Sequence, residues 1–184
     1  MLKIGTHNSA TGEKGRGLLS WLVTPFAKCQ KKTIREQYKA GCRLFDIRIR
    51  QVGQELLCAH GLWTSNRNAI DILQELDNLG ECYVMLTYEG KLSTEQSIKD
   101  FIAITDIIKK IFKNILFLEV SVKKGTNNKW QTLVKSEYSC ANRKGFISLD
   151  GSSWHTLLPI PWLWCKVVPL QPFNKDIYTL IDFL

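Results

Sequence analysis

The chain has 184 residues, of which 45% are hydrophobic and 23% are charged. This balance excludes a disordered or collagen-like chain, and the length indicates a single domain spanning residues 1–184. The excess of 25 Lys and Arg residues over 17 Asp and Glu residues gives a net charge of +8. Such an excess attracts anionic surfaces, lipid or nucleic acid, without choosing between them.

Six scattered cysteines form no CxxC pair, so we expect reduced, mostly buried thiols rather than a zinc site. No basic and apolar leader precedes Ile4, and no apolar run reaches the roughly 18 residues that a membrane span needs. The chain as given is therefore expected to be cytoplasmic, or a secreted form that has already lost its signal.

Short apolar runs alternate with longer amphipathic segments, which is typical of an α/β fold with a largely parallel sheet. Helices are predicted where apolar residues recur at helical spacing, and the first two end at a glycine. In chain order the prediction is a strand at residues 2–5, a helix at 33–40, strands at 44–49 and 56–59, a helix at 69–79, a strand at 82–88, a helix at 98–112, and strands at 115–122, 145–149 and 177–183.

These seven strands, with residues 164–168 as a further candidate, fit a (β/α)₈ or TIM barrel. That barrel usually needs about 250 residues, so we expect a compact barrel that is incomplete or distorted. An open doubly wound sheet is the alternative, and the composition does not separate the two.

Polar residues follow or end most of the predicted strands. Because the carboxyl ends of parallel strands gather in one crevice, we expect these side chains to converge there. Period-two alternation also places the aspartate and the arginine of LFDIRIR on one face of their strand. The candidates are His7, Asn8, Asp46, Arg48, His60, Glu89 and Asp182.

Four segments in this order, GTHNSATG, TIREQYKAGCRLFDIRIR, AHGLW and YVMLTYEG, resemble the X region of phosphatidylinositol-specific phospholipase C, a PLC-like phosphodiesterase. The resemblance covers roughly residues 2–90 and implies a TIM barrel. It also implies acid/base catalysis by His7 and His60, with a cyclic inositol phosphate and diacylglycerol as products. By the same resemblance, Asp182 orients the base histidine.

Asp46 followed by Arg48 resembles the metal-independent bacterial members, so we expect no cofactor. The arginine would supply the positive charge for a phosphate, and Asp46 would hold it in place. The pair His7-Asn8 and Glu89 look more like the calcium-dependent branch. We expect Asn8 and Glu89 to bind substrate, whereas in a site that used Ca or Mg the ligands would be Asn8, Asp46 and Glu89.

The segment GLLSWLVTPFAK, residues 17–28, resembles the short apolar helix with which bacterial members touch membranes. Trp21 would insert there, and Trp162 and Trp164 would form a second patch at the rim, since tryptophan favours interfaces. The alternatives are a core-facing helix for the first segment and a plug at the barrel bottom for the second. We expect a monomer that meets its phospholipid substrate at a membrane surface.

Three other functions stay open. The first is a phosphodiesterase acting on another lipid or on a glycerophosphodiester, although the His-Arg-Gly opening of glycerophosphodiesterases is absent. The second is a non-catalytic basic lipid-binding module, which would not need both His7 and His60. The third is a nucleic-acid binder, and no basic stripe interleaved with aromatic residues supports it.

Overall fold

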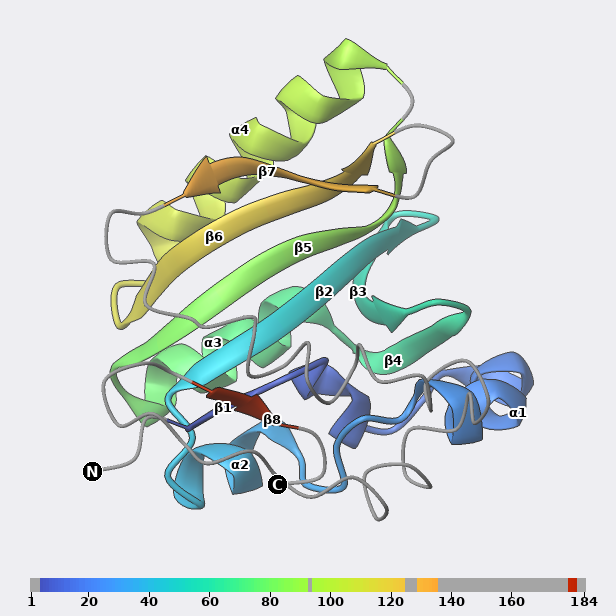
Figure 1. Ribbon diagram of the computed structural model, residues 1–184, viewed down its shortest axis with the longest axis vertical. Coiled ribbons are helices and arrows are strands. Elements are labelled where there is room, and N and C mark those ends of the chain that lie inside the picture. Colours follow the sequence, from blue (N-terminus) through green and yellow to red (C-terminus); the bar gives the residue numbers. More distant parts are fainter. Residues whose placement is uncertain (1–3, 93, 125–128, 136–178, 182–184) are drawn as a thin grey trace.

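The computed structural model describes residues 4–92, 94–124, 129–135 and 179–181. In these residues one sheet of eight strands carries helices along it (Figure 1). The strands are β1 (Ile4–Thr6), β2 (Leu44–Val52), β3 (Glu55–His60), β4 (Trp63–Asn68), β5 (Cys82–Leu92), β6 (Ile115–Lys124), β7 (Lys129–Lys135) and β8 (Thr179–Ile181). The helices are the 3₁₀ turn η1 (Ser9–Gly12) and α1 (Gly17–Ala27), α2 (Ile34–Lys39), α3 (Ala69–Leu79) and α4 (Glu95–Ile111).

Strand β2 is the branch point of the sheet. One edge pairs in parallel with β5 along residues 44–49. The other edge pairs first with β1 in parallel, where Gly5 lies opposite Leu44, and then with β3 in antiparallel, where Cys58 lies opposite Ile49. The ends of β1 and β3 therefore approach each other beside the middle of β2.

The remaining strands extend the sheet in the order β4-β3-β2-β5-β6-β7, and β8 pairs with β1. The predicted parallel arrangement holds for β1, β2, β5, β6 and β8, whereas β3, β4 and β7 join by antiparallel pairing. β7 and β8 do not pair among the described residues, so the sheet stays open there. The α/β prediction is confirmed, and so is the incomplete barrel.

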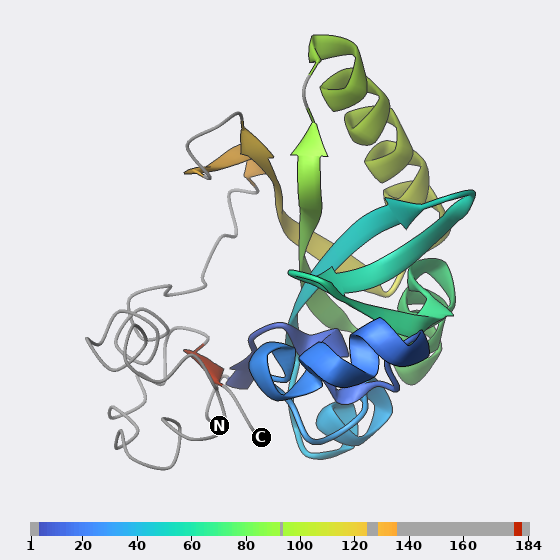
Figure 2. The ribbon, with the colours of Figure 1, turned by 90° about the vertical axis from the view of Figure 1, so that its right-hand side faces the viewer.

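The hydrophobic core lies between the sheet and the helices α2, α3 and α4. Figure 2 shows α3 and α4 on the same side of the sheet. Phe45, Ile47 and Ile49 of β2 are fully buried in this core. Because side chains alternate along a strand, Asp46 and Arg48 face the opposite side of the sheet.

Capping residues explain where the helices begin. Thr33 and Glu36 form a capping box at α2, and Asn68 accepts a hydrogen bond from the backbone of α3. A second capping box, formed by Thr94 and Ser97, starts α4 three residues before the predicted position 98. Each cap stabilises its helix by about 1 kcal/mol. The capping residues, and not the apolar repeat, therefore determine the residue at which each helix begins.

The strands predicted at residues 145–149 and 164–168 lie outside the described residues. The four cysteines that the structure describes, Cys29, Cys42, Cys58 and Cys82, are buried and form no disulfide, as expected. Burial raises the pKa of the Cys58 thiol to about 12, which suits an inert core residue. Within the described ranges, no helix combines the length and the apolar character that crossing a membrane requires.

Candidate active site

His7 and Asn8 follow β1 directly, at the turn into η1. Asn8 has a left-handed backbone conformation with φ 45° and ψ 47°, which asparagine adopts more readily than most residues. Its backbone N–H donates to Asp46 Oδ2 at 3.2 Å, and Gln30 Nε2 donates to the His7 carbonyl at 2.9 Å. These two bonds fix the turn over the middle of β2.

Arg48 lies at the centre of the site. Its Nη2 is 2.8 Å from His7 Nε2 and 3.3 Å from Asp46 Oδ2, and its Nη1 is 3.5 Å from Glu89 Oε2. Burial disfavours the charge of the guanidinium, but Asp46 and Glu89 outweigh that effect and raise the pKa of Arg48. Since a guanidinium only donates, His7 Nε2 must carry a lone pair in this arrangement.

His60 reaches the same place at the end of β3. Its Nδ1 is 2.7 Å from the carbonyl oxygen of Ala27, at the end of α1. A carbonyl only accepts, so Nδ1 carries the hydrogen, and Nε2 lies 3.3 Å from Asn8 Nδ2. The ring centroids of His7 and His60 are 6.3 Å apart. Burial, followed by the charge of Arg48, lowers the pKa of His60, so the free protein favours the neutral imidazole.

The structure brings six of the seven predicted catalytic and substrate-binding residues together. Glu89 is buried on β5 and accepts from the Gly61 backbone N–H at 3.3 Å, as well as from Arg48. Glu89 therefore links the turn after His60 to the guanidinium of Arg48 through hydrogen bonds. Asp182 lies outside the described residues, so its predicted contact with the base histidine stays a prediction.

Two groups at this site were not predicted from the sequence. One is the Ala27 carbonyl that binds His60. The other is Cys29, whose sulfur lies 3.4 Å from Asn8 Nδ2 and whose backbone N–H donates to Thr11 Oγ1 at 2.9 Å. A backbone carbonyl group cannot be recognised from the sequence. A single cysteine outside any motif gives no reason to select it as a site residue.

The arrangement does not suit a divalent metal ion. Asp46 and Glu89 both bind the guanidinium of Arg48, which lies between them and supplies the positive charge that they neutralise. A cation placed there would meet a fixed positive charge instead of free carboxylates. In the described part of the chain, no three side chains of the His, Cys, Asp and Glu types are grouped to hold a metal ion.

A large apolar surface lies next to the site on α1, which packs against β4. Trp21 is 69% exposed at its centre, so the alternative of a core-facing helix is wrong for this face. A cavity of about 320 Å³ runs from Val23 and Phe26 to His60. We call this surface the α1 patch, and its exposed members are Leu18, Leu19, Trp21, Leu22, Phe26 and the neighbouring Leu62.

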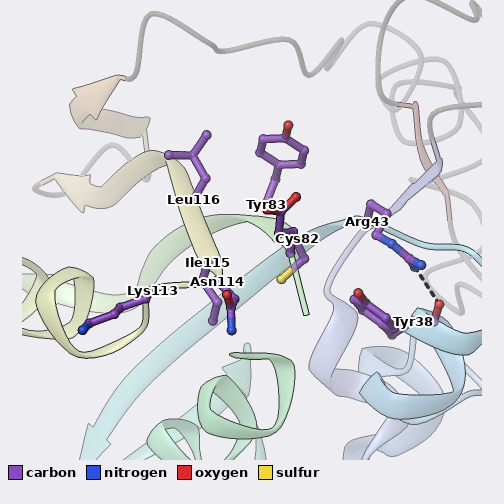
Figure 3. Close-up of a pocket in the computed structure, with 9 residues that line it drawn as sticks. Tyr38, Arg43, Cys82, Tyr83, Lys113, Asn114, Ile115 and Leu116 are labelled. Atoms are coloured by element: carbon purple, nitrogen blue, oxygen red, sulfur yellow. Dashed lines mark hydrogen bonds between the residues drawn. The ribbon is translucent and has the colours of Figure 1, made fainter. Parts of the chain in front are cut away.

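A larger hollow, of about 700 Å³, lies at the amino ends of β2, β5 and β6 (Figure 3). Arg43 and Tyr38 line one side, with the guanidinium stacked 3.8 Å above the tyrosine ring. Lys113 and Leu116 line another side. None of the predicted catalytic residues lines this hollow, so the larger volume of the hollow does not mark it as the candidate active site.

The predicted Trp162 and Trp164 lie outside the described residues.

No protein-family model matches the chain, and a search of curated proteins finds no match. Among solved structures, a point mutant of phosphatidylinositol-specific phospholipase C from Staphylococcus aureus matches with a TM-score of 0.57 and 12% identity, over 98% of this chain and 84% of that one. A further S. aureus structure, which concerns modulation of membrane binding, gives a TM-score of 0.54 and 11% identity, over 98% and 85% of the two chains.

The enzyme from Listeria monocytogenes matches with a TM-score of 0.51 and 15% identity, over 99% of this chain and 88% of that one. Sequence identities this low support only a similarity of fold, and the structures from both organisms show the same fold. The chain therefore has the fold of bacterial phosphatidylinositol-specific phospholipase C, as its sequence motifs predicted.

Proposed function

We propose that this protein is a phosphodiesterase that cleaves phosphatidylinositol by intramolecular attack, without a metal ion. The observation that carries the proposal is the junction of three groups: Arg48 Nη2 lies 2.8 Å from His7 Nε2, and His60 Nε2 faces the same space across Asn8. A base, a fixed cation and an acid are the parts that transfer of a phosphoryl group to a neighbouring hydroxyl requires.

His7 acts as the general base. Its Nε2 takes the proton of the inositol hydroxyl next to the phosphate, so that the hydroxyl oxygen attacks phosphorus and the new P–O bond closes a ring. In the free protein this lone pair accepts a hydrogen bond from Arg48. Arrival of the anionic phosphate draws the guanidinium toward its oxygens, and the lone pair of His7 Nε2 then takes the proton in place of the hydrogen bond from Arg48.

Arg48 stabilises the charge that builds up on the phosphate oxygens. Its forked donors suit a phosphate, and Asp46 and Glu89 hold the fork in place at 3.3 and 3.5 Å. His60 acts as the general acid: the proton on Nε2 passes to the glycerol oxygen as the P–O bond to diacylglycerol breaks. The bond from Nδ1 to the Ala27 carbonyl directs Nε2 toward that oxygen.

The same contacts support a reaction without a metal ion. The ligands of a calcium or magnesium site would be Asn8, Asp46 and Glu89, but Arg48 already binds both carboxylates. The positive charge that a metal ion would supply to the phosphate comes from the guanidinium.

Turnover of phosphatidylinositol vesicles with and without a chelator tests the proposal. We expect cyclic inositol phosphate and diacylglycerol at the same rate in both conditions, measured by phosphorus NMR and lipid extraction. Loss of turnover in the chelator would assign Asn8, Asp46 and Glu89 to a metal ion. Turnover of a glycerophosphodiester but not of phosphatidylinositol would replace the substrate, and turnover of neither would leave a non-catalytic lipid-binding module.

The α1 patch supports contact with a membrane. Isolated apolar residues are common on protein surfaces, but contiguous ones beside a catalytic site mark an interaction surface. Trp21 and Phe26 are both more than half exposed, and Phe26 and His60 line the same cavity. The net charge of +8 adds attraction to anionic lipid. We propose that α1 enters the bilayer surface and brings the active site to its substrate.

Trp21→Ala tests this contact. Because the indole would leave the bilayer interface, we expect at least about tenfold weaker binding to phosphatidylinositol vesicles in a sedimentation assay. Hydrolysis of soluble inositol cyclic phosphate should change less than twofold. The matched control is Ile107→Ala, since Ile107 is 57% exposed on α4, far from α1 in Figure 1. Equal loss of vesicle binding in both variants would contradict a specific role of α1.

A further inference from the structure

The cavity of about 320 Å³ beside His60 lies between α1 and the turn that follows β3. The described residues that line it are Val23, Phe26, Ala27, His60, Gly61 and Leu62. Among them, His60 alone carries a polar side chain. Phe26 and Leu62 are 54% and 64% exposed, so much of the apolar wall is in contact with solvent. A ligand with apolar carbon atoms would remove this surface from water, which is favourable.

The ring of His60 lies between this cavity and the polar part of the candidate active site. Its Nδ1 donates to the carbonyl oxygen of Ala27, a residue of the cavity wall, at 2.7 Å. Its Nε2 lies 3.3 Å from Asn8 Nδ2, on the side where Arg48 meets His7. One edge of the imidazole therefore borders the apolar wall, and the other edge faces the groups proposed to act on the phosphate.

The proposed reaction divides the substrate at the same place. A general acid must lie within hydrogen-bond reach of the oxygen that leaves. Phosphorus and the inositol ring lie on one side of that oxygen, and the carbon atoms of the leaving alcohol lie on the other side. With the phosphate bound to Arg48, the carbon atoms of the alcohol therefore begin beside His60, where the cavity offers them an apolar surface.

We propose that this cavity is the subsite for the leaving group and that it binds the apolar carbon atoms of a lipid alcohol. The inference rests on the proposed function, and it narrows the substrate class to phosphodiesters with an apolar leaving group. Binding pockets commonly combine an apolar lining with a few polar groups that fix the orientation of the ligand. Free glycerol fits this wall less well, because its hydroxyl groups would lose water without gaining polar side-chain partners other than His60.

The subsite predicts a dependence on chain length in the absence of any membrane. The test substrates are the n-alkyl esters of inositol phosphate from ethyl to hexyl, used as monomers below the concentration at which they aggregate. Their leaving alcohols have similar acidity, whereas each methylene group buried in the cavity strengthens binding by up to about fourfold. Because this binding is the same before and during the reaction, we expect KM to fall at least about tenfold along the series and kcat to change less than about twofold.

Val23→Phe tests whether the cavity causes this dependence, because the larger side chain fills space that Val23 borders. We expect KM of this variant to change less than about twofold from the ethyl to the hexyl ester. The matched control is Val52→Phe, the same exchange at the end of β2, where the side chain is 40% exposed and does not line the cavity. The control should keep the chain-length dependence of the wild type.

If Val23→Phe failed to fold, Leu62→Asn would take its place, since Leu62 is exposed in a turn and substitutions at such positions change stability little. An amide in the apolar wall should limit the fall in KM along the series to less than about threefold. Cleavage of the esters with the same chain-length dependence in the cavity variant and the wild type, or with none in the wild type, would overturn the subsite and leave the proposed function intact.

A binding measurement keeps the two proposals separate. If the wild type cleaves none of the esters, the proposed function fails, and binding of hexanol then decides about the cavity without any turnover. We expect hexanol to shift the NMR signals of the Leu62 methyl groups in the wild type and in Val52→Phe, but not in Val23→Phe. Signals that do not shift in the wild type, or that shift equally in Val23→Phe, would overturn an apolar binding site in this cavity.

Discussion

Replacing His7 with alanine is expected to lower kcat for phosphatidylinositol cleavage by roughly 10²- to 10⁴-fold, the range typical of a lost general base. His60→Ala should cause a loss of similar size on the same substrate, because the glycerol oxygen leaves poorly without a proton. Both imidazoles contact Asn8, and only His7 contacts Arg48, so the two variants remove different parts of one site. Initial rates on mixed micelles measure both losses.

A second substrate separates the base from the acid. With a nitrophenyl ester of inositol phosphate the leaving group needs no proton, so His60→Ala should recover most of its activity and His7→Ala should not. The control is His155→Ala, the third histidine of the chain, to which we assign no role. Equal loss in His7→Ala and His60→Ala on both substrates would contradict the division of roles.

The order of protonation also predicts a pH dependence. Burial and Arg48 lower the pKa of His60, so its acid form is populated only below the ordinary histidine value of about 6.5. As pH rises through that lowered pKa, His60 loses the proton that it donates, and kcat/KM falls. The alkaline limb for the wild type should therefore lie on the acidic side of pH 6.5 and should be missing from the His60→Ala profile.

The sequence predicted most of the candidate active site because the residues of this site come from short segments of strong local pattern. Alternation along LFDIRIR placed Asp46 and Arg48 on one face, and the structure confirms that face, since Phe45 and Ile47 fill the core. Parallel strands account for only part of the convergence. His60 does not end a strand parallel to β2; it arrives on the antiparallel β3, which runs back along the edge of β2.

Other features could not be read from the sequence. β4 has the residues WTSNRN, whose polar character gives no strand signal; it pairs because β3 offers it an open edge. The Ala27 carbonyl reaches His60 only because α1 ends beside β3, which is a fact of tertiary packing. The apolar residues of α1 suited a core helix as well as a surface helix, and the exposure of Leu18, Trp21 and their neighbours in the structure speaks against the core helix.

Arg48→Lys is the most informative change at the site. Lysine keeps one positive charge, so Asp46 and Glu89 do not become buried carboxylates without a partner, a loss that costs about 3–5 kcal/mol when one side of such a pair is removed. A single ammonium cannot reach His7 Nε2 and both carboxylates at once, and it offers a phosphate no forked pair of donors. We expect kcat to fall about 10²- to 10³-fold, with Tm lowered by only a few degrees.

The matched control is Arg16→Lys, because Arg16 pairs with Glu55 at the exposed surface. This variant should lose no activity. A chelator series belongs in the same experiment. If the guanidinium takes the place of a metal ion, Arg48→Lys should show the same lowered kcat whether calcium is present or removed. A variant with nearly full activity would show that positive charge alone is sufficient, and the forked geometry held by Asp46 and Glu89 would then have no part in the reaction.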